Sequence, residues 1–283
     1  MTLLELLDRT TDFFEKKSVE SPRLHAELLT AHVLQKKRLS LYLEHDRPVS
    51  DLELDQLRPL VKRCSDHEPI QYILGSAEFC GLQLAVTPDV LIPRPETEWL
   101  VELVIQNLGS LATGCIADVG TGSGAIALAL AAGLPGWEIH ATDLSPAAID
   151  IAKANQNSHP ELEVAFHQGH LLEPLSTLPI TTIVSNLPYL TDQEMSGLPE
   201  NVKHEPTLAL HGGQQGLDLI NELIQSLGDH QQITSIFLEC GLGQPEILEE
   251  VLDKDGWQTK IYPDAQERNR FFFAQRVYEP NCK

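Results

Sequence analysis

Residues 115–130 place the strongest constraint on the fold of this chain. They read CIADVGTGSGAIALAL, with an apolar run typical of a strand, glycines at positions 120, 122 and 124, and an Ala/Leu/Ile run typical of a buried helix. Glycines at this spacing let the backbone turn sharply and approach a ligand, and the free N–H groups at a helix start favour a carboxylate or phosphate. The stretch predicts a strand, a glycine turn and a helix that bind a small-molecule cofactor.

The glycines alone do not choose the cofactor. Residues 122–127 also fit the loose dinucleotide pattern G-x-G-x-x-A, so a nicotinamide or flavin site stays open. Two acids help to identify the cofactor. Asp118 precedes the first glycine, and Asp143 ends the next apolar strand. This combination is similar to the S-adenosylmethionine (SAM) loop of class I methyltransferases. The resemblance implies that the loop faces the methionine part of SAM and that Asp143 accepts hydrogen bonds from the ribose hydroxyls. A strand-turn-helix unit without a ligand is the structural alternative.

Charge and apolar patterning limit the classes of partner. The 283 residues carry a formal net charge of −21, and no long Lys/Arg cluster is available to hold a phosphate backbone. We therefore expect no direct nucleic-acid contact. The apolar run at 125–134 is too short to cross a bilayer, and the N-terminus lacks a basic signal-peptide segment. Five scattered cysteines without a C-x-x-C pair predict reduced thiols in a cytoplasmic protein. We expect a monomer, with no metal site.

Residues 1–75 predict a small all-helical domain. Thr2 with Glu5, and Ser50 with Glu53, are capping boxes that open amphipathic helices, and Ser21 is expected to cap a helix that starts at the following proline. Pro59 lies inside the third helical pattern, where we expect it to kink or split the helix. Residues 76–94 contain a short alternating segment broken by a glycine, which predicts a β-ribbon linker to a catalytic domain at 95–283.

Helices and strands alternate through the rest of the chain. Strands are expected at 115–119, 137–142, 164–167, 181–185, 233–239, 257–262 and 271–278. This rhythm predicts an α/β fold with a doubly wound, mostly parallel sheet and a ligand at the carboxyl ends of its strands, where Asp118, Asp143 and Asn186 emerge. Residues 190–216 are polar and without periodicity, as in functional lids or disordered loops. The segment LIPRPETE at 91–98 places Arg94 between two prolines, either lining the site or acting as a linker.

The tetrapeptide NLPY at residues 186–189 indicates the chemistry. It resembles the [Asn/Asp]-Pro-Pro-[Tyr/Phe] signature of methyltransferases that modify planar nitrogens. An amide nitrogen is a poor nucleophile because its lone pair is delocalised, and two acceptors aimed at its two N–H bonds localise that pair. We assign the Asn186 side-chain oxygen and the Leu187 carbonyl as the acceptors and Tyr189 as the aromatic platform, with Pro188 and Arg94 also contacting the substrate. Leucine in place of proline lowers preorganisation by up to about 1 kcal/mol. A plain Asx/Pro turn is the alternative.

Taken together, the chain resembles peptide chain release factor glutamine methyltransferases of the HemK type. Beyond the two motifs above, the resemblance rests on SPRLHAELL at 21–29, EPIQYILG at 68–75, the 91–98 segment and EPTLALHGGQQGLD at 205–218. It implies a class I methyltransferase, Rossmann-like sheet of seven strands, the last antiparallel, preceded by a helical domain that helps to dock the substrate protein. The implied reaction is SAM-dependent N5-methylation of the glutamine in the Gly-Gly-Gln loop of a class I release factor, which acts in translation termination, with S-adenosylhomocysteine as the product.

The resemblance also implies a set of cofactor positions. His170 departs from the pattern, because relatives commonly carry an acid there that is associated with the adenine end of SAM, and an imidazole would stack or hydrogen-bond instead. The implied cofactor residues are Asp118, Gly120, Thr121, Gly122, Ser123, Gly124, Asp143, Leu144, His170, Leu171 and Asn186.

Three other functions remain open from the sequence. Glutamine methylation of a large-subunit ribosomal protein would use the same scaffold and tetrapeptide. Adenine-N6 methylation of DNA would need a basic groove, against which the acidic composition argues. A module that binds SAM without turnover would account for the departures at Leu187 and His170.

Overall fold

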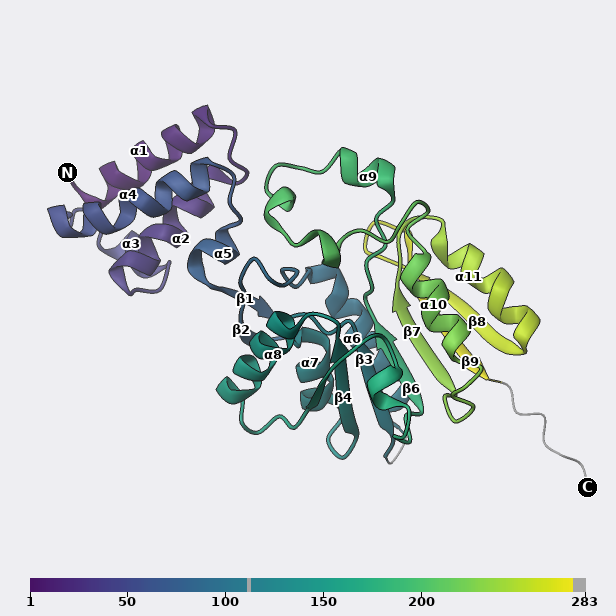
Figure 1. The fold of residues 1–283 in the computed structure, drawn as a ribbon. Helices are drawn as coiled ribbons and strands as arrows, with labels where there is room; N and C mark the ends of the chain where they lie inside the picture. Colours follow the sequence, from purple (N-terminus) through teal and green to yellow (C-terminus); the bar gives the residue numbers. More distant parts are fainter. Residues whose placement is uncertain (111–112, 277–283) are drawn as a thin grey trace, which may run out of the picture. The chain divides into compact units, whose positions relative to one another are not determined.

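The computed structural model describes residues 1–110 and 113–276, which divide into two compact units (Figure 1). One unit comprises Met1–Ser76 together with Pro199–His204, and the other comprises Ala77–Leu198 and the chain from Glu205 onward. The end of the last expected strand, at 277–278, lies outside the described residues. Within the described ranges, no helix is long and apolar enough to cross a membrane.

The first unit consists of five helices around their own apolar core. They are α1 Leu3–Lys16, α2 Pro22–Leu34, α3 Ser40–Leu43, α4 Asp51–Ser65 and α5 Ile70–Leu74. The predicted capping boxes at Thr2 and Ser50 are confirmed, since each side chain accepts a hydrogen bond from the backbone N–H three residues on. Ser21 stands at the N-cap of α2 and Pro22 at its first position, as expected. The backbone of Ser21 is left-handed, with φ 46°, and its side chain makes no capping hydrogen bond.

Pro59 does not split its helix. The helix α4 continues from Asp51 to Ser65 through the proline. A proline inside a helix removes one backbone hydrogen bond and crowds the preceding turn. Here Leu57 and Cys64, which lie on either side of Pro59, are both buried in the core of this unit and hold the two halves against it. Tertiary packing therefore outweighs the local cost. The split, one of the two expected effects of Pro59, was wrong, and a kink stays a prediction.

The second unit is built on a seven-stranded sheet with the order β5-β4-β3-β6-β7-β9-β8. The neighbouring pairs among β3 to β7 are parallel, whereas β9 runs antiparallel to both β7 and β8. This confirms the predicted seven strands with the last one antiparallel. The strands are β3 Cys115–Val119, β4 Glu138–Asp143, β5 Ala165–Gln168, β6 Thr182–Ser185, β7 Ser235–Glu239, β8 Trp257–Pro263 and β9 Asn269–Arg276.

Alternation along the strands gives the sheet two buried faces. On one face Ile116 packs in a cluster with residues of α6 and α7, and on the other Ala117 packs in a cluster with residues of α10 and α11. Every side chain of β3 is buried, because helices cover both faces of the sheet. The sheet is therefore doubly wound, as predicted. The helices of this unit are α6 Pro95–Leu108, α7 Ala125–Gly133, α8 Pro146–Ser158, α9 Asp192–Ser196, α10 Asp218–Ser226 and α11 Gln244–Leu252.

Two shorter segments complete the described chain. The expected β-ribbon is present as a separate two-stranded sheet of β1 Ser76–Phe79 and β2 Leu82–Ala85. The aperiodic stretch at 190–216 forms short elements: α9, opened by a capping box at Thr191, and the 3₁₀ turns Val202–His204 and Thr207–Ala209. Helices this short leave too few repeats for an apolar period to be seen in the sequence.

Candidate functional site

The glycine turn between β3 and α7 forms the floor of the site. Gly120, Gly122 and Gly124 have φ values of 78°, 56° and 82°, a region that other residues avoid. The backbone N–H groups of Gly120 and Thr121 both donate to Thr142 O at 2.9 Å, which ties the turn to the end of β4. The predicted strand-turn-helix is confirmed, and the turn is held in one conformation beside the strand ends.

Asp118 lies beneath this turn. Its Oδ2 accepts from Thr121 Oγ1 at 2.6 Å and from the Ala127 backbone N–H at 3.2 Å. Within the described residues, no hydrogen-bond partner reaches its Oδ1, and burial raises the pKa of this carboxyl to about 7. Asp118 therefore positions the turn from below and is a buried acid with unused acceptor capacity.

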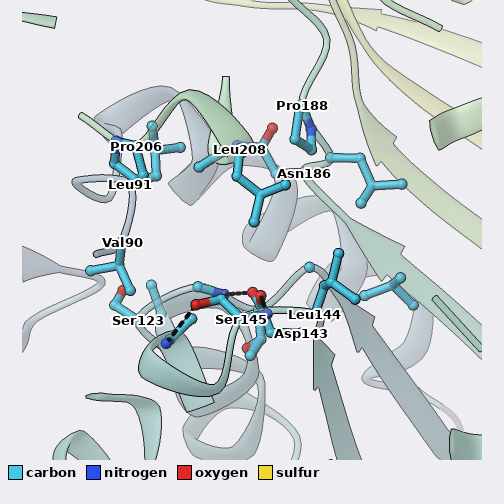
Figure 2. Close-up of a pocket in the computed structure, with 18 of the residues that line it drawn as sticks. Val90, Leu91, Ser123, Asp143, Leu144, Ser145, Asn186, Pro188, Pro206 and Leu208 are labelled. Atoms are coloured by element: carbon cyan, nitrogen blue, oxygen red, sulfur yellow. Dashed lines mark hydrogen bonds between the residues drawn. The ribbon is translucent and has the colours of Figure 1, made fainter. Parts of the chain in front are cut away.

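Asp143 lies at the carboxyl end of β4 and faces the turn from the side. Its Oδ2 accepts from the Gly122 N–H at 2.8 Å, and its Oδ1 accepts from the Ser145 N–H at 2.9 Å (Figure 2). Burial raises its pKa. Each carboxylate oxygen can accept a further hydrogen bond, because an ionised carboxylate offers about four lone-pair sites. The side chain is thus oriented by the backbone and keeps acceptors for a ligand.

A cavity of about 290 Å³ opens above the turn, at the carboxyl ends of the strands. Ser123, Asp143 and Ser145 lie on one side of it, and Asn186, Pro188 and Leu208 lie across from them (Figure 2). Its volume is close to the lower end of the range for small-molecule sites. The structure brings most of the predicted residues together in the wall, namely Arg94, Gly120, Thr121, Gly122, Ser123, Asp143, Leu144, His170, Leu171, Asn186, Leu187 and Pro188.

Three predicted residues are not part of this wall: Asp118, Gly124 and Tyr189. The wall also contains residues that were not predicted, chiefly apolar ones from the segments before α6 and after residue 205. These include Phe79, Val90, Leu91, Thr97, Pro206, Leu208 and Ala209. The motifs at 91–98 and 205–218 carried the sequence signal for most of them, whereas Phe79 and Val90 lie outside both motifs.

The side chain of Asn186 is held by a chain of hydrogen bonds that runs from the cavity wall to Glu239. Asn186 Nδ2 donates to Thr97 Oγ1 at 3.1 Å, and Thr97 Oγ1 donates to Glu239 Oε2 at 2.7 Å. A threonine hydroxyl has one hydrogen. Because that hydrogen is given to the carboxylate, the hydroxyl can only accept from Asn186. The amide nitrogen of Asn186 must therefore face Thr97, which leaves its Oδ1 available to a ligand.

Glu239 anchors this chain of hydrogen bonds at the carboxyl end of β7. It is 1% exposed, burial raises its pKa, and its Oε1 accepts from the Tyr189 hydroxyl at 3.2 Å. The Arg270 guanidinium lies 5.4 Å from the centre of the Tyr189 ring, and it also donates to Cys240 O at 3.1 Å. Tyr189 is thus a partly buried member of this network. An acid at the end of a buried strand was the visible sequence signal for Glu239.

Arg94 and Glu205 clamp two segments that line the cavity. Arg94 Nη2 lies 2.5 Å from Glu205 Oε1, and Glu205 Oε2 accepts from the Ile92 N–H at 3.1 Å. The Glu205 side chain is almost fully buried, so its charge depends on this pairing. Arg94 lines the cavity, but its charge is already matched. Glu205 was missed because its partners lie over a hundred residues away in the sequence.

His170 occupies the wall below α10. Its Nε2 lies 2.8 Å from Glu222 Oε1, and the next residue, Leu171, has a left-handed backbone with φ 45°. With Nε2 directed at the carboxylate, Nδ1 is the nitrogen left for another partner. The departure at this position therefore keeps a polar group on the cavity wall.

Comparisons with known proteins find matches in both the helical part of the chain and the part that contains the cavity. The PrmC N-terminal domain matches residues 5–75 and the methyltransferase small domain matches residues 97–205. Three similar proteins carry the name release factor glutamine methyltransferase. The one from Geobacter sulfurreducens is 38% identical over 90% of both chains. The one from Coxiella burnetii is 41% identical over 84% of this chain and 86% of that protein, and the one from Deinococcus radiodurans is 35% identical over 98% and 99%.

Among solved structures, the catalytic domain of hMettl16 in complex with MAT2A 3′UTR hairpin 1 superposes with a TM-score of 0.59. It is 19% identical and covers 90% of this chain and 92% of that one. The same domain in complex with hairpin 6 gives a TM-score of 0.56 at 18% identity, over 82% and 84% of the two chains. This likeness concerns the fold alone, and it agrees with the expected class I methyltransferase architecture.

Proposed function

Because the chain belongs to the release factor glutamine methyltransferase family, we propose that it transfers a methyl group from SAM to the side-chain nitrogen of a glutamine in a class I peptide chain release factor. The products are N5-methylglutamine and S-adenosylhomocysteine. The target glutamine is that of the Gly-Gly-Gln motif. The helical unit, whose sequence matches the PrmC N-terminal domain, contributes to docking of the release factor.

One observation carries this proposal: the fixed orientation of the Asn186 amide. The hydrogen bonds through Thr97 to Glu239 direct Nδ2 towards Thr97 and leave Oδ1 as the free acceptor on the cavity wall. An acceptor is what a carboxamide substrate requires, because its nitrogen presents two N–H donors. The opposite orientation would bring two NH₂ groups together.

The residues around the glycine turn fit SAM. Asp143 retains acceptor capacity for the ribose hydroxyls, and a Cβ at Gly122 would meet nothing within 4 Å, so the backbone there is open to close approach. Leu144, His170 and Leu171 line the adjoining wall and would hold the adenine end. Asp118 supports the turn from outside the cavity wall, through its hydrogen bonds with Thr121 and the Ala127 N–H. When bound, SAM supplies a methyl group that its sulfonium makes electrophilic.

The chemical contribution of this chain lies in two acceptors. Asn186 Oδ1 and the Leu187 carbonyl accept from the two N–H bonds of the glutamine carboxamide and draw its lone pair onto the nitrogen, towards the methyl group. Both acceptors are fixed before the substrate arrives, so little reorganisation accompanies the reaction. No strong general base is needed, because the amide nitrogen is positively charged and still carries both hydrogens once it has taken the methyl group, and this cation readily loses one proton to water.

The test is a methyl-transfer assay with three candidate substrates. The purified protein is incubated with SAM and, separately, a class I release factor, a large-subunit ribosomal protein and adenine-containing DNA, and the methylated residue is mapped by mass spectrometry. We expect N5-methylation at the glutamine of the release factor. The Asn186→Ala variant should lose transfer while binding SAM normally. Methylation confined to the ribosomal protein or DNA, or an active Asn186→Ala variant, would refute the proposal.

A further inference from the structure

A second group of chemically active side chains lies near the amino-terminal ends of β3 and β4, whereas the cavity lies at the carboxyl ends of the strands. Cys115 is the first residue of β3, Glu138 is the first residue of β4, and His140 follows two residues later. Cys115 pairs with Glu138, and Ala117 pairs with His140, in the parallel register. Residues two apart on a strand share a face, so all three side chains point to the same side of the sheet. The methyl-transfer site uses none of them.

These three side chains converge on one point. The Cys115 Sγ, a Glu138 carboxylate oxygen and a His140 ring nitrogen all lie within 4.8 Å of one another. Cys115 and His140 are 4% and 5% exposed, whereas the Glu138 side chain is 62% exposed. A thiol, an imidazole and a carboxylate are thus gathered at a point that is reached from solvent through Glu138.

A second histidine fixes the orientation of the first. His140 Nε2 lies 2.9 Å from Glu138 Oε1, and His140 Nδ1 lies 3.0 Å from His167 Nε2 on β5. The two ring nitrogens of His140 therefore face different partners. A metal-binding histidine commonly donates its other N–H to a nearby acceptor, which sets its tautomer and orientation. His167 is placed to accept from Nδ1 when Nε2 binds a metal.

The connection after β5 helps to explain why polar groups occur on this face. The chain passes from β5 to β6 through the 3₁₀ turn Glu173–Leu175 and loops, whereas α7 and α8 form the preceding two crossovers. Because this connection contains no α-helix, it packs no helix over the polar side chains on this face of β4 and β5. They need partners of their own, because buried polar groups without partners are costly.

We propose that Cys115, Glu138 and His140 bind one Zn²⁺ ion, with His167 as the hydrogen-bonding partner of His140. Sulfur, nitrogen and oxygen donors of these three types are the usual protein ligands of zinc, and solvent would complete a tetrahedral set. Thiolate and imidazole together disfavour Mg²⁺ and Ca²⁺, which prefer oxygen. Zinc donors lie roughly 3.3–3.8 Å apart at the usual bond lengths. The three donor atoms lie within 4.8 Å of one another, so they must move closer together to bind zinc. The Glu138 side chain can make this movement because it is exposed.

This site departs from the expectation of no metal. That expectation rested on the lack of C-x-x-C or similar spacing, which is the signature of ligands carried on one local turn. Here the first two ligands are 23 residues apart, counting from 115 to 138, and strand register brings them together. Burial raises the pKa of the Cys115 thiol to about 11, so the ion must displace a proton on binding.

The test uses the tag-free, full-length protein and two metal probes. Zn²⁺ binding is measured by equilibrium dialysis with elemental analysis, and Co²⁺ binding is followed by the thiolate-to-cobalt charge-transfer band in the near ultraviolet. We expect one ion per chain and a charge-transfer band in the wild-type protein. Cys115→Ser should abolish the band, and the exposed cysteine variant Cys80→Ser should leave it unchanged.

Two further variants test the rest of the site. Glu138→Gln changes an exposed side chain, so the fold should be kept while metal affinity falls. His167→Gln should weaken binding by about 10- to 100-fold, as for other partners of metal-binding histidines. The circular dichroism spectrum and SAM affinity of each variant verify its fold. A wild-type protein without the band, a band that survives Cys115→Ser or is lost in Cys80→Ser, or unchanged affinity in Glu138→Gln would overturn the proposal.

Discussion

Replacing Thr97 with valine tests whether the orientation of Asn186 matters for methyl transfer. Valine has nearly the same shape as threonine but lacks the hydroxyl that accepts from Asn186 at 3.1 Å and donates to Glu239 at 2.7 Å. Without it, the Asn186 amide nitrogen loses the hydrogen-bond acceptor that fixes its orientation. Its Oδ1 then faces the substrate for only part of the time. Thr97 is a positioning residue, because it acts through Asn186.

The structure sets the size of the expected effect. A hydrogen bond of this kind contributes about 0.5–1.5 kcal/mol net, and losing a buried partner adds to the cost. A loss of about 1–2 kcal/mol in the stabilisation that the oriented Asn186 acceptor gives to the transition state corresponds to a fall of about 5- to 30-fold in the transfer rate. Complete removal of the acceptor should cost more, about 100- to 1,000-fold, as for other preorganised groups that stabilise a transition state. Thr97→Val should therefore lie between the wild type and Asn186→Ala.

The assay is a single-turnover measurement of methyl transfer to a class I release factor at saturating SAM. Thr97→Ser is the matched control, because serine keeps the hydroxyl and should retain most of the rate. SAM affinity, measured by calorimetry, should be unchanged in both variants. The reasoning is refuted by a Thr97→Val rate within about twofold of the wild type, or by an equal loss in Thr97→Ser, since the latter would point to packing rather than the hydroxyl.

Three other predictions follow from the same site. Asp143→Ala should weaken SAM binding by about 10- to 150-fold in calorimetry, because charge-assisted hydrogen bonds contribute about 1.5–3 kcal/mol each; unchanged affinity would remove Asp143 from the cofactor site. Glu205→Gln breaks the ion pair with Arg94 and should raise KM for the release factor more than it lowers kcat. Burial raises the pKa of Glu239, so the rate should fall as the pH drops through that raised value, and Glu239→Gln should flatten this acidic limb. A limb unchanged in that variant would contradict the assignment.

The features predicted correctly from the sequence are those fixed by local physics. The capping boxes at Thr2 and Ser50 depend on side chains three residues apart, and the glycine turn depends on backbone conformations that other residues avoid. The order in which strands and helices alternate is also visible in the sequence. Because crossover connections between parallel strands are right-handed, this order leads to the doubly wound sheet. For these elements the neighbouring sequence contains all the information that the fold uses.

The features that were missed depend on contacts between distant residues. Glu239 bonds to Thr97 across 142 sequence positions, and Glu205 bonds to Arg94 across 111. Nothing in the sequence near either acid shows that its partner exists. Pro59 is the converse case, because its local cost was visible while the packing of Leu57 and Cys64 that outweighs it was not. Burial decides all three, and burial is a property of the assembled fold.

The substitution at residue 187 shows how the assembled fold can replace a local constraint. A proline there would fix the backbone through its ring, whereas Leu187 is 4% exposed and packs into the core beneath α10. A Cβ on Gly120 would lie only 3.0 Å from Leu187 Cδ2, so the glycine turn and the leucine fit against each other. Burying a leucine contributes about 1.5–3 kcal/mol, which exceeds the preorganisation of about 1 kcal/mol that a proline supplies. Packing therefore holds the Leu187 side chain against the glycine turn, and we expect this contact to restrain the backbone at Leu187 in place of a proline ring.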